Sequence, residues 1–181
     1  MFRTENKIYK LILLLNLFFI VACVFFSVMN VLSSLDNALG IVCESTNIIA
    51  LVFAAFYICF GYHKNAAQYY KVFGVMLIVA RIVGLILSLQ SPESGVVSAL
   101  LSFAQLALLI VLTFVKDLGE KHSINLCVAL MICSILSLIV LILSNGTIKP
   151  IITNLVRLDL HSLYGILTYA KYLDKTERGT K

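Results

Sequence analysis

The sequence predicts an all-α polytopic membrane protein, a bundle of six transmembrane helices with both ends of the chain in the cytoplasm. Three observations predict this fold. The 181 residues are 61% hydrophobic and only 13% charged, with a mean hydropathy of +1.01. Apolar stretches of membrane-spanning length recur along the chain, and the basic residues alternate between their ends. A soluble domain of this size has too little interior to bury so much apolar surface.

Residues 1–181 are expected to form a single domain, because the chain holds only two prolines and nine glycines and no stretch has the composition of a linker. The first ten residues, MFRTENKIYK, precede an apolar stretch as the start of a signal peptide does. That stretch is too long for a signal peptide and no cleavage motif follows it. We therefore expect an uncleaved first helix.

A spanning helix needs about 20 mostly apolar residues. Six segments satisfy this requirement, at residues 11–32, 39–61, 69–89, 96–115, 124–144 and 151–172. The second must begin before Asn47 to be long enough, which places Glu44 in its first turns. The sixth is the least hydrophobic. Because the connections are short, consecutive helices are expected to pack antiparallel.

Lysine and arginine predict the orientation, because cytoplasmic loops retain positive charge. Only Lys149 falls on the outer side, and two arginines lie within the spans. The other eleven of the fourteen basic residues share one side: Arg3, Lys7, Lys10, Lys64, Lys71, Lys116, Lys121, Lys171, Lys175, Arg178 and Lys181. Both termini are therefore expected in the cytoplasm, with the plasma membrane as the location. A chain with five spans would place the last four of these residues outside.

The two arginines within the spans are Arg81 and Arg157. A charged residue at the centre of a membrane helix costs roughly 2.5–3.5 kcal/mol, so such residues face the bundle interior or a water-filled cavity. Small and polar residues recur at three- and four-residue spacing in every span, which places them on one face of each helix. The sixth span has the longest such stripe: Asn154, Arg157, His161, Tyr164, Thr168 and Lys171.

The depth of these polar residues predicts a pocket that opens to the outside. Most of them lie in the outer half of the membrane, whereas the inner half is lined mainly by Leu, Ile, Val and Phe, which form an apolar plug. Thr168 and Lys171 continue the sixth stripe inward. The candidate solute-binding residues are Glu44, Asn47, Arg81, Gln105, Arg157, Asp159 and His161. Stripes of this kind are also ordinary packing surfaces between membrane helices, which remains the alternative.

Asp159 does not fit a single polar face, because on a regular helix it points nearly opposite to Arg157 and His161. Three arrangements would accommodate it. The sixth helix is buried on both sides, or it is unwound near its middle as in many transporters, or a subunit interface covers Asp159.

The charged cluster allows three kinds of chemistry. The two acids can pair with the two arginines as buried structural ion pairs. Alternatively, at least one arginine is free to bind an anionic group. The third possibility is proton coupling through His161 and an acid.

No catalytic signature occurs, so an enzyme is not expected, nor is a cofactor. The cysteines Cys23, Cys43, Cys59, Cys127 and Cys133 form no CxxC pair and are expected to pack as small apolar residues rather than to bind metal. The basic residues cluster at segment ends, which excludes a nucleic-acid partner.

The sequence thus predicts a small membrane protein that binds a polar or anionic solute from the outer side, as a transporter or as its capture subunit. The main alternative is an accessory, sensory or assembly subunit whose charged sixth helix pairs with another protein or another copy. The third is an oligomeric pore with Thr168 and Lys171 at its inner mouth. Besides the lipid bilayer, the expected partners are therefore the solute, a second copy or a membrane subunit.

Overall fold

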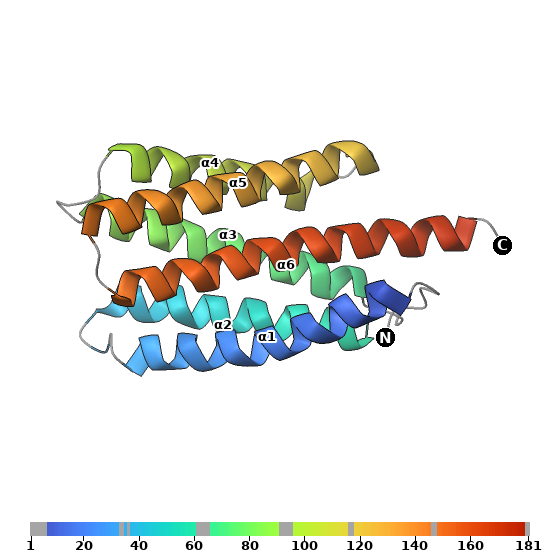
Figure 1. Ribbon diagram of the computed structural model, residues 1–181, viewed down its shortest axis with the longest axis horizontal. Helices are drawn as coiled ribbons and strands as arrows, with labels where there is room; N and C mark the ends of the chain where they lie inside the picture. The colour runs from blue at the N-terminus through green and yellow to red at the C-terminus, as the bar shows by residue number, and fades with distance from the viewer. Residues whose placement is uncertain are drawn as a thin grey trace.

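The chain forms a bundle of long helices in the computed structural model (Figure 1), which describes residues 7–32, 35, 37–60, 66–90, 96–115, 118–145 and 148–179. The helices of this part of the chain are α1 (Lys7–Leu32), α2 (Ala38–Phe60), α3 (Ala66–Gln90), α4 (Val96–Phe114), α5 (Glu120–Asn145) and α6 (Ile148–Gly179). No strand occurs in these ranges. The predicted all-α class is confirmed.

Five of these helices, α1 to α5, are long and apolar enough to cross a membrane, as the sequence predicted. The sixth, α6, is not among them. It is the longest helix at 32 residues, about 48 Å, but the least apolar one.

The helix ends fall close to the predicted span ends, and the differences have local causes. At the start of α2, the Asn37 side chain accepts a hydrogen bond from Gly40 N at 3.2 Å, which is the geometry of a helix N-cap. At its end, α2 stops at Phe60, and the predicted last residue, Gly61, lies outside the described ranges. The last helix, α6, continues seven residues beyond the predicted end at Tyr172. The prediction followed the apolar residues, and a helix can continue past the end of its apolar segment.

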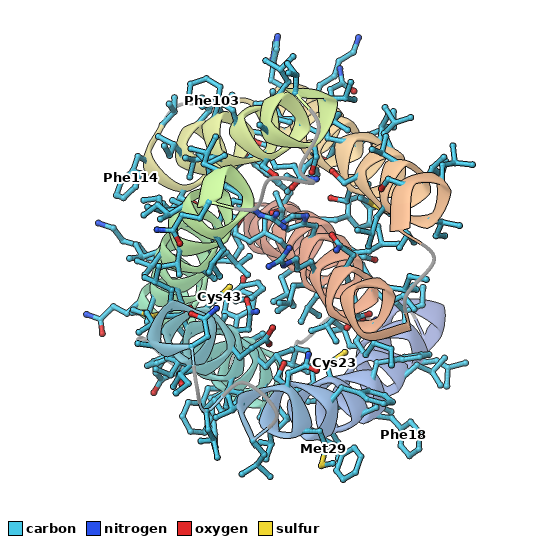
Figure 2. All side chains as sticks on the ribbon, turned by 90° about the vertical axis from the view of Figure 1, so that its left-hand side faces the viewer. Phe18, Cys23, Met29, Cys43, Phe103 and Phe114 are labelled. Atoms are coloured by element: carbon cyan, nitrogen blue, oxygen red, sulfur yellow. The ribbon has the colours of Figure 1, made fainter. Side chains whose placement is uncertain are left out.

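Neighbours in sequence pack side by side, and α6 lies in the middle of the bundle. Contacts join α1 to α2, α2 to α3, α3 to α4, and α4 to α5, while α6 packs against α5, α1, α2 and α3. Figure 2, which looks along the bundle, shows α6 inside the arc that the other five helices form. The start of α1 and the end of α6 lie at one end of the bundle, here called the terminal end (Figure 1). The opposite end is called the distal end.

The outward faces of the helices are apolar, whereas the charged α6 is shielded. Phe18, Val96 and Leu143 are between 76% and 81% exposed, and Figure 2 shows Phe18, Met29, Phe103 and Phe114 pointing away from the bundle. Exposed apolar surface of this extent is typical of contact with lipid. Because α6 has helices on several sides, it does not need the continuous apolar surface that a lipid-facing helix requires.

The half of the bundle toward the terminal end is more polar than the predicted apolar plug. Its core includes Leu51, Phe73, Leu130 and Leu167. Within this core the Tyr70 hydroxyl lies 2.6 Å from Thr168 Oγ1, and further hydroxyl contacts join the residues Thr113 with Tyr164 (3.1 Å) and Ser123 with Tyr172 (2.7 Å). The Tyr70 and Tyr164 rings are 5.2 Å apart between centroids. Aliphatic and tyrosine side chains thus fill the core of this half of the bundle, and contacts between pairs of hydroxyl groups join its helices.

Candidate functional site

The two arginines of the membrane-length helices line one cavity between α2, α3 and α6. Its lining consists of Asn47, Leu77, Ala80, Arg81, Arg157, Leu160 and His161. Asn47 lies nine residues after the start of α2, Arg81 nine residues before the end of α3, and Arg157 nine residues after the start of α6. All three are therefore about 14 Å from the distal end of the bundle, at 1.5 Å per residue.

The free volume of this cavity is about 10 Å³. A space of this size holds about one water molecule. The bundle is therefore closed around the two guanidinium groups, and a larger ligand requires α6 to shift relative to α2 and α3.

Neither arginine has a carboxylate partner within the ranges that the structure describes. Arg81 is only 6% exposed. The Arg157 guanidinium contacts the Cys43 sulfur, with Nη2 and Sγ 3.8 Å apart. Arg157 also packs against α3 at Gly84, where a Cβ atom would lie 3.4 Å from Nη2. One buried and one partly buried positive charge, Arg81 and Arg157, therefore face one cavity without the ion pairs that the sequence allowed. Guanidinium groups are suited to binding anions.

His161 is fixed in the same cavity by a serine of α5. The Ser134 hydroxyl donates to the Leu130 carbonyl at 2.8 Å and contacts His161 Nδ1 at 2.5 Å. Because the single hydroxyl hydrogen points to Leu130, Ser134 accepts from Nδ1–H. In the neutral imidazole this arrangement leaves a lone pair on Nε2, which can accept a hydrogen bond from a ligand. Of the described contacts of His161, none is with an acid.

Gln105 reaches this level of the bundle from α4 but does not line the cavity. Its Nε2 lies 3.4 Å from Ser134 Oγ and 3.1 Å from Ser137 Oγ. The side chain is 1% exposed, and its Oε1 has no hydrogen-bond partner among the described residues. Gln105 therefore supports the cavity through Ser134 and His161.

Glu44 is buried beside the cavity rather than in it. Its Oε2 accepts a hydrogen bond from Asn47 Nδ2 at 3.4 Å, and the carboxylate forms no ion pair within the described part of the chain. Asn47 lines the cavity and also contacts Glu44, so it links the two.

Asp159 lies on the other side of α6. Its Oδ2 accepts a hydrogen bond from Cys23 Sγ on α1 at 3.2 Å. Figure 2 shows Cys23 between α1 and α6. The helix α6 is continuous through this region, so it is not unwound. It is packed on both sides, with α1 on the side of Asp159.

Four of the seven candidate residues thus meet at one cavity: Asn47, Arg81, Arg157 and His161. Glu44 contacts Asn47 of its lining, and Gln105 contacts Ser134, which holds His161. Asp159 points away from the cavity. Sequence reasoning missed the polar contacts of Cys23 and Cys43, because all five cysteines were expected to pack as small apolar residues. Their positions at three- and four-residue spacing from polar neighbours were the available signal.

No group of three or more His, Cys, Asp or Glu side chains arranged to hold a metal ion occurs among the described residues. The cavity presents the donors of two positively charged guanidinium groups and therefore favours an anionic ligand. A protonated oxygen of such a ligand can also donate a hydrogen bond to His161 Nε2. Comparison of the chain with models of protein families, with curated proteins and with solved structures yields no match.

Proposed function

We propose that this protein binds a small anion between α2, α3 and α6 and carries it across the membrane, as a transporter or as its capture subunit. The observation that carries the proposal is the pair of arginines, Arg81 buried and Arg157 partly buried, that face one cavity without a carboxylate partner in the described ranges. An uncompensated buried charge is strongly unfavourable, so the Arg81 guanidinium, with a second positive charge beside it, favours a negatively charged partner in the cavity.

The proposal includes a sixth span and a cytoplasmic location of both termini in the plasma membrane. The shielding of α6 inside the bundle supports the sixth span, because its charges need not face lipid. In this orientation the distal end faces outward, and the cavity lies in the outer half of the membrane. Lys149 is the basic residue at the distal end, whereas Lys71 and Lys121 lie near the terminal end.

The orientation is tested with two reporters fused after the end of α6 and after the end of α5. Green fluorescent protein fluoresces when it stays in the cytoplasm, and alkaline phosphatase is active when it is exported. The fusion after α6 should fluoresce, and the fusion after α5 should give phosphatase activity. Identical reporter behaviour at both sites would show that α6 does not cross.

Anion binding is tested by the thermal unfolding of the purified protein in detergent with choline salts of phosphate, sulfate, acetate and chloride. A bound anion raises the unfolding midpoint in a saturable way. Arg81→Gln and Arg157→Gln each remove a charge-assisted hydrogen bond, worth about 1.5–3 kcal/mol, and should weaken binding by at least about tenfold.

The matched control is Lys121→Gln, which removes one positive charge from an exposed position on α5. It should bind anions as the wild-type protein does. If Lys121→Gln weakens binding as much as the arginine variants, the effect comes from net charge, and the proposed pocket is wrong.

The alternatives are less well supported. The main basis for an assembly subunit was an Asp159 carboxylate in need of a partner, and Cys23 of the same chain contacts it. For the pore, Thr168 is 3% exposed and contacts Tyr70, so it is packed in the core. The Lys171 side chain lies outside the described residues.

A further inference from the structure

A second polar cluster lies between α1, α2 and α6, next to the arginine cavity but separate from its lining. It contains the hydroxyl of Ser27 on α1 and the carboxylate of Glu44 on α2. Ser27 is 0% exposed and Glu44 is 6% exposed. Neither belongs to the cavity that Arg81 and Arg157 line.

The packing of α1 fixes the direction of Ser27. In the described ranges, α1 contacts only α2 and α6, so a fully buried α1 side chain faces one or both of them. Cys23, one turn earlier on the same side of α1, contacts Asp159 of α6. The adjoining side of α1 holds the buried Ile20 and Leu13. Ser27 lies between these two directions and, because it is fully buried, points into the junction of α1 with α2 and α6, the two helices that contact it.

Glu44 points into the same junction from α2. The preceding residue, Cys43, lies 3.4 Å from the Ala80 carbonyl of α3. At about 100° per residue, Asn47 lies about 40° and Glu44 about 100° from Cys43 in the same sense around α2. Glu44 therefore lies beyond Asn47, on the side away from α3, and the other helices that contact α2 are α1 and α6. Ser27 lies five residues before the end of α1, and Glu44 lies six residues after the start of α2. Because the two helices are antiparallel, the side chains are at the same depth.

The oxygen atoms of this junction lack the partners that buried groups require. Ser27 Oγ has no hydrogen-bond partner among the described residues. The Glu44 carboxylate has the Asn47 amide at 3.4 Å and no basic partner in the same ranges. Buried polar groups are nearly always satisfied, and a buried carboxylate without a counter-charge is costly. A hydroxyl and a carboxylate are oxygen ligands of the kind that a hard cation prefers.

We propose that Ser27 Oγ and the Glu44 carboxylate bind a sodium ion at the junction of α1, α2 and α6. One carboxylate balances one positive charge, which favours a monovalent ion over calcium or magnesium. Asn47 lines the arginine cavity and donates to Glu44, so an ion beside Glu44 orients a side chain of that cavity. Occupation of the two sites is therefore coupled, and each ligand raises the affinity for the other.

The test is the thermal unfolding of the purified full-length protein in sodium chloride against choline chloride at equal concentration, so that chloride and ionic strength are constant. Sodium should raise the midpoint of the wild-type protein in a saturable way. Glu44→Gln and Ser27→Ala should each lower the apparent sodium affinity by at least about tenfold. Ser27→Ala removes only one oxygen atom, so it provides the test of the site if the Glu44→Gln variant fails to fold.

Ser102→Ala is the matched control, because it removes a buried hydroxyl of α4 far from this junction. It should keep the full sodium response. An equal effect of sodium and choline on the wild-type protein overturns the proposal. An undiminished sodium response in both Glu44→Gln and Ser27→Ala overturns it as well. Neither result would bear on anion binding, which is measured without sodium.

Discussion

The Asp159 carboxylate accepts a hydrogen bond from the Cys23 thiol at 3.2 Å and so joins α6 to α1 at mid-depth in the bundle. The two residues are 136 positions apart in the chain. The contact explains how α6 can carry Asp159 on the side opposite to Arg157. Each of these two polar sides of α6 packs against a neighbouring helix.

Replacing Cys23 tests the strength of this contact. Cys23→Ala should lower the free energy of unfolding by about 1–3 kcal/mol, because it leaves a partly buried carboxylate without its donor. Cys23→Ser keeps a donor and should be closer to the wild type. Chemical denaturation in detergent measures both. Cys133→Ala on α5 is the control, and an equal loss in that variant would assign the effect to lost packing volume.

Gly74 marks the closest approach of α3 to its neighbours. A Cβ atom there would lie 2.7 Å from Thr113 Oγ1 and 3.2 Å from Tyr164 Cε2. Gly74→Ala should therefore destabilise the protein by about 1–3 kcal/mol through overpacking. The measurement is the unfolding midpoint of the purified protein.

Gly165→Ala is the matched control for Gly74→Ala, since its Cβ would meet Cys127 Cβ at an ordinary 3.5 Å. Adding Thr113→Ala to Gly74→Ala should restore part of the stability, because it removes the clashing atoms. If the loss of stability in the double variant equals the sum of the losses in the two single variants, the steric explanation is wrong.

Gly84 leaves room for the Arg157 guanidinium against α3. Gly84→Leu should displace Arg157 and weaken anion binding by about tenfold or more, with both positive charges still present. Gly84→Ala places its Cβ 3.4 Å from Nη2 and should have a much smaller effect. Titration with choline phosphate or sulfate compares them. Unchanged affinity in Gly84→Leu would mean that the position of Arg157 does not matter for binding.

Ser134 holds His161 in place and also contacts Gln105. Ser134→Ala should cost about 1–3 kcal/mol of unfolding free energy, because it removes a hydrogen-bond partner from buried groups. Ser102→Ala, which deletes a hydroxyl of similar burial on α4, should cost less than 1 kcal/mol by the same reasoning. Denaturant unfolding curves of the two variants provide the comparison.

Helical periodicity was sufficient to bring Arg157 and His161 to one face of α6, and it correctly set Asp159 apart. Periodicity specifies a direction around a helix, but it does not specify which neighbour lies in that direction. For that reason Cys23 could not be identified as the contact of Asp159, nor Ser134 as the contact of His161. Both depend on the order in which the helices pack.

Two other features could not be predicted from composition. Tyr70 lies in a region that was read as an apolar plug, because an aromatic side chain in an apolar run gives no sign of where its hydroxyl points. Tyr164 was placed in the polar stripe of the sixth span, but its contact with Thr113 was not predicted. The difficulty with α6 has the opposite cause. The mean hydropathy of α6 is low, and the packing of other helices around it allows this. A hydropathy scale assumes that lipid surrounds a spanning helix on all sides, so it does not detect a helix of this kind.

The central position of α6 has a consequence for how the protein is made. In the six-span topology that we propose, α6 is the last helix in chain order and enters the membrane after its neighbours. Taken alone, it would expose Arg157, Asp159 and His161 to hydrocarbon. Its insertion therefore depends on a groove that α1, α2, α3 and α5 have already formed. A defect in any of these earlier helices should appear first as a chain whose last helix stays outside the bilayer.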